Sequence, residues 1–92
     1  MKMVVIMYLE GDEDCVQRLL KQTGVEVFSR LPMEGIGPGS SGWYGKASPY
    51  RSQAILAVVE AATARDLLRA VEECEGVEDP NHPIRAVQMP VE

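Results

Sequence analysis

Apolar residues along the chain form four runs of strand length and two stretches of helical spacing. The runs are short, rich in β-branched residues and bounded by turn-forming or acidic residues, which is typical of β-strands. They cover residues 3–9, 25–31, 53–59 and 84–89. In the helical stretches, apolar residues recur every three or four positions and therefore line one face of a helix. These residues are Val16, Leu19 and Leu20 in the first stretch and Leu67, Leu68, Val71 and Cys74 in the second.

Capping residues predict where the two helices begin and end. Asp12 or Asp14 can accept hydrogen bonds from the free amides at the start of the first helix. Gly24 can adopt the left-handed conformation that commonly ends a helix. By the same rules, Thr63 is the expected cap of the second helix and Gly76 its expected end.

The predicted order of elements is strand, helix, strand, strand, helix, strand. This order is typical of a ferredoxin-like α+β fold, a βαββαβ sandwich in which two helices cover one face of a four-stranded antiparallel sheet. A length of 92 residues predicts a single domain that spans 1–92.

Two of the predicted strands are apolar on both faces. A strand with one solvated face alternates apolar and polar residues, but 3–9 and 54–59 contain almost no polar residue. The chain offers no third helix to cover the second face of the sheet. The pattern therefore predicts a homo-oligomer in which another copy of the sheet covers it.

A long loop is predicted at about 32–52, beginning where Pro32 is expected to close the second strand. It carries five glycines and three prolines and includes the stretch GIGPGSSGWYG. Its residues 37–42 match the G-x-G-x-x-G fingerprint of dinucleotide-binding proteins, which requires a helix directly after the glycines. The residues that follow, WYGKASP, cannot open a regular helix, so the match is accidental. Loops of this length in small domains are usually functional or disordered.

The loop and its surroundings supply groups that could bind an anion. Glycines allow backbone amides to approach a ligand, serine hydroxyls donate hydrogen bonds, and lysine and arginine supply positive charge. The candidate ligand-binding residues are Gly35, Gly37, Gly39, Ser40, Ser41, Gly42, Lys46, Arg51 and Arg85. Three aromatic residues, Trp43, Tyr44 and Tyr50, offer stacking surfaces. The alternative is a loop whose aromatic residues pack on a neighbouring subunit.

Composition and charge exclude several classes of protein. Apolar residues make up 46% and charged residues 25% of the chain, which argues against intrinsic disorder. A net charge of -5 excludes a general nucleic-acid coat, because phosphate binding needs a basic face. The first apolar run is far shorter than a membrane span and lacks the cleavage site of a signal peptide. We therefore expect a cytoplasmic protein with no membrane insertion.

The sequence contains no recognisable catalytic constellation, so we expect a protein that is not an enzyme. Cys15 and Cys74 are widely separated, which predicts free, buried or half-buried thiols rather than a disulfide framework. The sequence neighbours of Cys15 are acidic and do not favour a nucleophilic thiolate. The alternative is a small enzyme with its active site under the long loop, for which Glu34 and Glu60 are the nearby acids or bases.

Two acidic groups resemble metal sites. The run Asp12–Asp14 is better explained as the start of a helix, whose dipole favours acidic residues. His82, the single histidine, lies near Glu78 and Asp79 and could bind a divalent metal with one of them. A solvated turn is the better explanation for His82, because no second histidine completes a common site.

The order of these segments, with GIGPGSSGWYG, then YRSQAILAVVE and a terminal HPIRAVQMPVE, resembles the PII-like signalling superfamily over nearly the whole chain. This superfamily includes the nitrogen regulatory protein PII. The ending also resembles that of the CutA divalent-cation-tolerance family. The resemblance implies a trimer whose sheets line the interior, adenine nucleotides in clefts between subunits, and a long loop that engages a transporter, enzyme or regulator.

By position, the base of the PII loop corresponds to Gly35 and Gly37, and the second ligand-contacting segment to 76–85. In that segment PII proteins have a glycine-rich sequence with a lysine, whereas this chain has GVEDPNHPIR. The resemblance implies a homotrimeric sensor that binds ATP, ADP, AMP or bicarbonate and signals through the 32–52 loop. The alternative is a CutA-like trimer that binds a divalent metal through His82 with Glu78 or Asp79.

Overall fold

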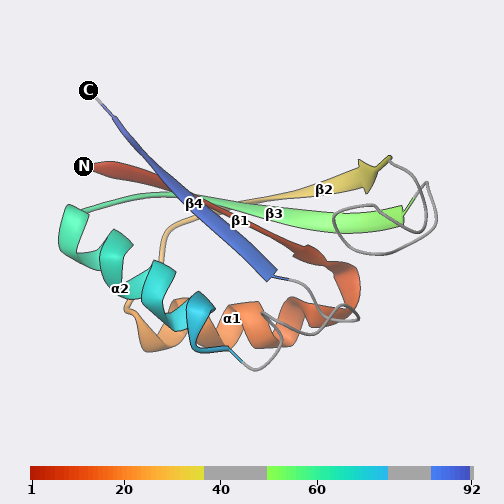
Figure 1. The fold of residues 1–92 in the computed structure, drawn as a ribbon, viewed down its shortest axis with the longest axis horizontal. Helices are drawn as coiled ribbons and strands as arrows, with labels where there is room; N and C mark the ends of the chain where they lie inside the picture. Colours follow the sequence, from red (N-terminus) through yellow and green to blue (C-terminus); the bar gives the residue numbers. More distant parts are fainter. Residues whose placement is uncertain (37–49, 75–83, 92) are drawn as a thin grey trace.

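The computed structural model describes residues 1–36, 50–74 and 84–91 (Figure 1). As the apolar pattern predicts, its strands and helices follow the order β1, α1, β2, β3, α2, β4. One short 3-10 turn, η1, lies between β1 and α1. The bounds are β1 Lys2–Leu9, η1 Glu10–Asp12, α1 Glu13–Gln22, β2 Ser29–Gly35, β3 Tyr50–Val59, α2 Ala61–Glu72 and β4 Ile84–Pro90.

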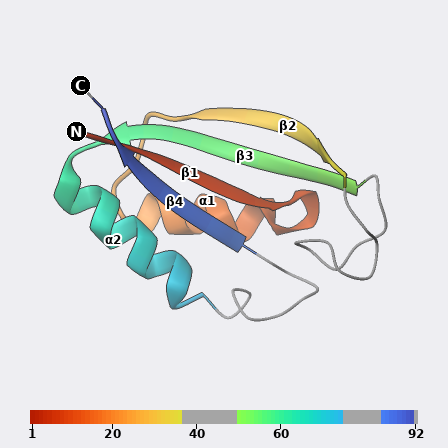
Figure 2. The same ribbon diagram turned by 45° about the horizontal axis from the view of Figure 1, so that its top comes forward.

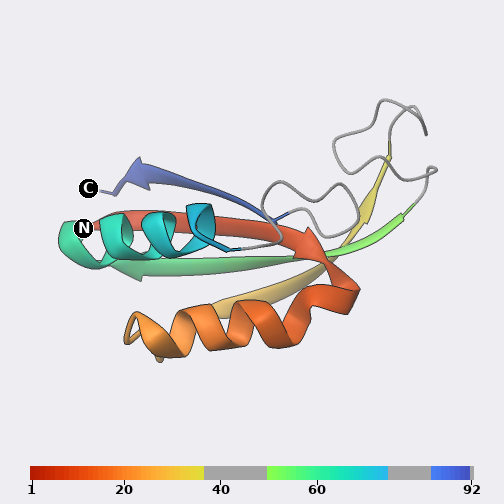
Figure 3. The ribbon, with the colours of Figure 1, turned by 60° about the horizontal axis from the view of Figure 1, so that its bottom comes forward.

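The strands form one four-stranded sheet in the order β2-β3-β1-β4, and every neighbouring pair is antiparallel (Figure 2). Both helices lie on the same side of the sheet, below the strands in Figure 1 and in front of them in Figure 3. This is the predicted ferredoxin-like α+β fold. None of the helices in the described part of the chain is long and apolar enough to cross a membrane.

The core lies between the sheet and the helices. In β1 every second residue, Val4, Ile6 and Tyr8, is fully buried against them. Burial of an aliphatic side chain of this size contributes roughly 1.5–3 kcal/mol. The largest fully buried side chains are Tyr8, Ile6, Leu20, Ile55, Leu67, Ile84, Val4 and Val16.

The opposite face of the sheet is apolar and has no helix over it. The register places Met3, Val5 and Met7 on this face, paired with Val58, Leu56 and Ala54 of β3. On the same face, Val58 of β3 and Val87 of β4 are 49% and 46% exposed. We call this surface the bare face; within one chain it remains partly open to water.

The second strand differs from the prediction of 25–31. It begins at Ser29 and runs through Pro32 to Gly35, so the expectation that Pro32 closes it is wrong. β2 is an edge strand that pairs only with β3, and an edge strand tolerates proline because one row of its amides has no partner strand. Residues 32–35 and 50–52, which were expected to belong to the long loop, are therefore paired strand residues of β2 and β3.

Val25 belongs to the end of α1 rather than to a strand. Gly24 has a φ of 77° and donates its amide to Lys21, while Val25 donates to Leu20 at 2.9 Å. These two bonds form a Schellman cap, in which the residue after the glycine packs back on the helix. Val25 is buried accordingly. The predicted helix end at Gly24 is confirmed.

The helix starts agree less well with the predicted caps. Asp12 occupies the cap position of α1, but its side chain makes no capping hydrogen bond. In α2 the cap position is Glu60, and the amide of Ala64 already donates to Glu60 at 2.9 Å, so Thr63 lies inside the first turn and is not the cap. Ala61 and Ala62 are strong helix formers, which explains why the helix starts directly after β3. Gly76 lies outside the described residues.

Candidate functional site

One end of the sheet gathers the described candidate residues. Here β1 and β2 end, and β3 and β4 begin (Figure 2). Gly35 is the last residue of β2, and Arg51 and Arg85 are the second residues of β3 and β4. The register confirms this alignment, because Leu9 at the end of β1 pairs with Ser52. Residues far apart in the sequence therefore lie at the same end of the sheet.

Arg51 and Arg85 lie on opposite faces of the sheet. Paired residues of an antiparallel sheet share a face, and faces alternate along each strand. Arg51 accordingly shares the helix-covered face with Tyr8, whereas Arg85 pairs with Met7 on the bare face. Arg85 also donates from Nη1 to the carbonyl oxygen of Ile84 at 3.1 Å. Because β1 runs between β3 and β4, about 10 Å separates the two arginine backbones across the sheet, and the register offsets them by about 10 Å more along the strands.

A hollow of ≈ 320 Å³ lies beside Arg51. Glu34 pairs with Arg51 across β2 and β3, and both residues are exposed. With Glu10, the hollow has two carboxylates and one guanidinium in its lining, so these residues alone do not attract an anion. Any anion bound here needs cations from elsewhere. The lining residues are Glu10, Pro32, Met33, Glu34, Arg51, Ser52 and Gln53.

Glu34 and Glu60, considered as acid and base for an enzyme, lie at different ends of the sheet. Glu34 lines the hollow beside Arg51. Glu60 follows the other end of β3, nine positions after Arg51, which corresponds to about 30 Å along a strand. They do not form an acid–base pair around one substrate.

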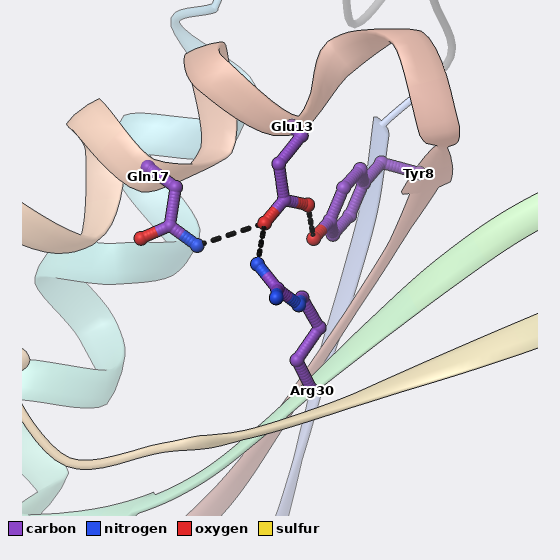
Figure 4. A network of polar contacts seen from close by, with 4 residues as sticks. All are labelled: Tyr8, Glu13, Gln17 and Arg30. Carbon is purple, nitrogen blue, oxygen red and sulfur yellow. Dashed lines mark hydrogen bonds and ion pairs between the residues drawn. The ribbon is translucent and has the colours of Figure 1, made fainter.

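A half-buried polar network lies next to this end of the sheet, and no pattern in the sequence pointed to it (Figure 4). The carboxylate of Glu13, in the first turn of α1, accepts hydrogen bonds from the Tyr8 hydroxyl at Oε2 and from the Arg30 guanidinium at Oε1. Gln17, one turn further along α1, donates to the same Oε1 at 2.9 Å. The network joins β1, α1 and β2.

The network shifts the protonation of both of its acids. Burial alone would raise the pKa of Glu13, but the hydrogen bonds from Tyr8, Gln17 and Arg30 outweigh it and hold that pKa below its usual value. Burial also raises the pKa of Tyr8, and the hydrogen bond to Glu13 adds to the rise. Glu13 is therefore a carboxylate and Tyr8 a neutral donor at neutral pH. Such a saturated arrangement is suited to fixing the fold rather than to proton transfer.

Several candidate residues lie outside the described residues. These are the remaining loop residues and the predicted metal set: Gly37, Gly39, Ser40, Ser41, Gly42, Lys46, Glu78, Asp79 and His82. In the ranges that the structure describes, no cluster of three or more His, Cys, Asp or Glu side chains could hold a metal ion. The acidic run Asp12–Asp14 begins α1, as the helix-start interpretation expected.

The fold is similar to solved structures of PII-like proteins. One is a PII-like signalling protein from Thermus thermophilus, with 21% identity and a TM-score of 0.67 over 96% of this chain and 83% of that chain. Another is CPII from Thiomonas intermedia, a nitrogen regulatory PII-like protein bound to ADP, AMP and bicarbonate. It shows 20% identity and a TM-score of 0.70 over 99% of this chain and 91% of that chain.

No family model and no curated protein matches the chain. At these identities the likeness shows the fold, and the PII-like fold that the sequence predicted is confirmed. The likeness to CutA and the metal site at His82 stay predictions.

Proposed function

We propose that this protein is a PII-like regulator rather than an enzyme, a homotrimer that binds a small anion at clefts between subunits. The ligand class is an adenine nucleotide, alone or with bicarbonate. The response passes through the 32–52 segment to a partner protein, a transporter or an enzyme. The observation that carries the proposal is that the strand ends flanking 37–49 and the start of β4 lie at one end of a PII-like sheet.

The bare face supports the oligomer. Val58, Val87 and Leu31 expose roughly half of their surface on a sheet face that has apolar residues on all four strands. Extended apolar surface of this kind marks an interaction site in soluble proteins. Closed symmetric assemblies of identical chains are the usual way to cover it.

The placement of the arginines supports a ligand site between chains. Arg51 and Arg85 lie on opposite faces with β1 between them, so a small anion cannot touch both from one chain. The carboxylates of Glu10 and Glu34 beside Arg51 make a second source of cations necessary. A neighbouring copy that contributes its own Arg85, or Lys46 of the 32–52 segment, would meet that requirement.

Calorimetric titration of the purified protein with ATP, ADP and AMP, each with and without bicarbonate, tests the proposal. We expect saturable heat with at least one nucleotide, with one site per chain in a trimer. Sedimentation velocity on the same sample measures the assembly. A stable monomer, or no heat and no thermal shift with any of these ligands, contradicts the proposal.

A further inference from the structure

Two thiols from different helices touch each other. Cys15 lies in the first turn of α1, and Cys74 lies just after the end of α2, 59 positions later. Their Sγ atoms are 3.4 Å apart, within hydrogen-bonding distance for sulfur. Both side chains are half-buried and both cysteines are free.

From this contact we propose that Cys15 and Cys74 form a reversible redox pair, which peroxide or a small disulfide converts into an intramolecular disulfide between the two helices. This inference is independent of the proposed ligand. A disulfide needs sulfurs about 2.0 Å apart, so the two atoms must approach by about 1.4 Å.

The surroundings allow that approach. Cys74 is beyond the last residue of α2, held by a hydrogen bond from its amide to the carbonyl oxygen of Val71 at 3.1 Å. Cys74 therefore lies outside α2, which ends two positions earlier at Glu72. Partial exposure lets a small oxidant reach the sulfurs, whereas a fully buried pair would be inert.

Arg18 lies beside Cys15 and can stabilise the negative charge of its thiolate. Burial and the contact with Cys74 raise the pKa of the Cys15 thiol above its ordinary value, and the Arg18 guanidinium offsets only part of that rise. The thiolate is the reactive form of cysteine. Attack by either sulfur gives the same disulfide, so the proposal rests on the contact between the two sulfurs and not on which one reacts first.

Hydrogen peroxide can oxidise the two thiols to a disulfide in two steps. The Cys15 thiolate attacks one peroxide oxygen, the O–O bond breaks, hydroxide leaves, and the sulfur becomes a sulfenic acid. The Cys74 sulfur then attacks the Cys15 sulfur, the S–S bond forms, and the S–O bond breaks with loss of water. In total, two thiols lose two protons and two electrons, and one peroxide becomes two waters.

Mass spectrometry of the intact protein after mild peroxide treatment tests the pair. We expect each chain to lose the mass of two hydrogen atoms, one proteolytic cross-link between the peptides that carry Cys15 and Cys74, and full reversal by a thiol reductant. Cys15→Ser and Cys74→Ser are matched controls that should keep their mass or gain oxygen. Since oxidation is measured on the parent chain, the test does not depend on how the variants fold.

Other products would overturn the inference. Independent sulfinic or sulfonic acids on the two cysteines, or disulfides only between chains, would show that the sulfurs do not meet in solution. Loss of two hydrogen atoms within one chain of Cys15→Ser would place the chemistry elsewhere. A glutathione disulfide titration adds a second oxidant, and it should give the same cross-link without a stable mixed disulfide at either cysteine.

Discussion

The hydroxyl of Tyr8, the last buried residue of β1, donates a hydrogen bond to the carboxylate of Glu13 at the start of α1. The bond spans the tight turn through η1 and fixes the angle at which the chain leaves the sheet. Arg30 of β2 closes the arrangement from the other side by an ion pair with the same carboxylate. One carboxylate thus ties three elements together.

The Glu13 network should make stability depend on acidity. The pKa of Glu13 is lower in the folded chain than its ordinary value of 4.5, so the unfolded chain binds more protons near that pH. The stabilisation is fully present above 4.5 and is lost as the pH falls through the lower folded value. Urea unfolding followed at several pH values should show this loss.

Glu13→Gln should remain folded at neutral pH and lose most of this acid dependence. It cannot ionise, and it no longer pairs with Arg30 as a charge. We expect it to be destabilised by about 1–3 kcal/mol at neutral pH, since a half-buried hydrogen-bonded group loses charged partners. Asp14→Asn, at an exposed neighbour in the same turn, is the matched control. A variant with the full acid dependence of the parent would remove Glu13 as its source.

A glycine should be required at position 24 because of its left-handed backbone conformation, and not because a side chain there would clash with neighbouring atoms. An added Cβ would meet no atom within 4 Å, but the φ of 77° is strained for residues with a side chain. Gly24→Ala should therefore cost about 1 kcal/mol of unfolding free energy. Gly11→Ala, where a Cβ also meets open space and no left-handed φ is involved, should change stability much less. Equal effects of both substitutions in urea unfolding would contradict the explanation.

The fold could be predicted because its signals are local. The period of the apolar residues identified both helices and three of the four strands, but it placed the second strand at 25–31, which overlaps β2 only at 29–31. Gly24 ended α1 for a reason contained in a few residues. Pro32 and Val25 were misread because their roles depend on context. A proline is compatible with a strand only if that strand is at an edge, and Val25 is apolar because it covers a helix end.

The candidate site could be predicted only in part. The face of the sheet on which a side chain lies, and the residues it contacts, depend on how the strands pair. The sequence indicated Arg51 and Arg85 as charged residues near loops, but their opposite faces depend on how β3, β1 and β4 pair. The bond from Arg30 to Glu13 spans 17 positions, and the contact between Cys15 and Cys74 spans 59. No spacing rule along the chain brings such pairs together.

A charge on the bare face should dissociate the proposed trimer. Val58 lies on that face and is 49% exposed in the single chain, so Val58→Asp leaves the core intact while placing a carboxylate in the subunit interface. Burial of an unpaired charge is strongly unfavourable. Ala62, exposed on α2 on the helix-covered side of the sheet, gives the matched control Ala62→Asp. Sedimentation velocity should show smaller species for Val58→Asp only, with unchanged circular dichroism.

Arg51 should contribute directly to anion binding. Removal of its charge in Arg51→Gln should weaken nucleotide binding by about tenfold or more, since a hydrogen bond to a charged group is worth roughly 1.5–3 kcal/mol. Arg65→Gln, at an exposed position of α2 remote from this end of the sheet, should bind as the parent does. Calorimetry at two salt concentrations should also show a smaller salt dependence for Arg51→Gln. Unchanged affinity in that variant would exclude Arg51 from the site, even if the trimer and nucleotide binding are both observed.

The disulfide between Cys15 and Cys74 should stabilise the fold once it forms. It would close a loop that spans 59 positions, and the chain-entropy model gives about 4 kcal/mol for a loop of that length. Strain from the approach of the sulfurs reduces this value, so we expect the oxidised protein to gain about 2–4 kcal/mol over the reduced one. Urea unfolding of both forms at the same protein concentration measures the difference, and Cys15→Ser treated with the same oxidant controls for damage elsewhere. An oxidised chain that is less stable than the reduced chain would mean that the bond distorts the helix pair, contrary to the contact that the structure shows.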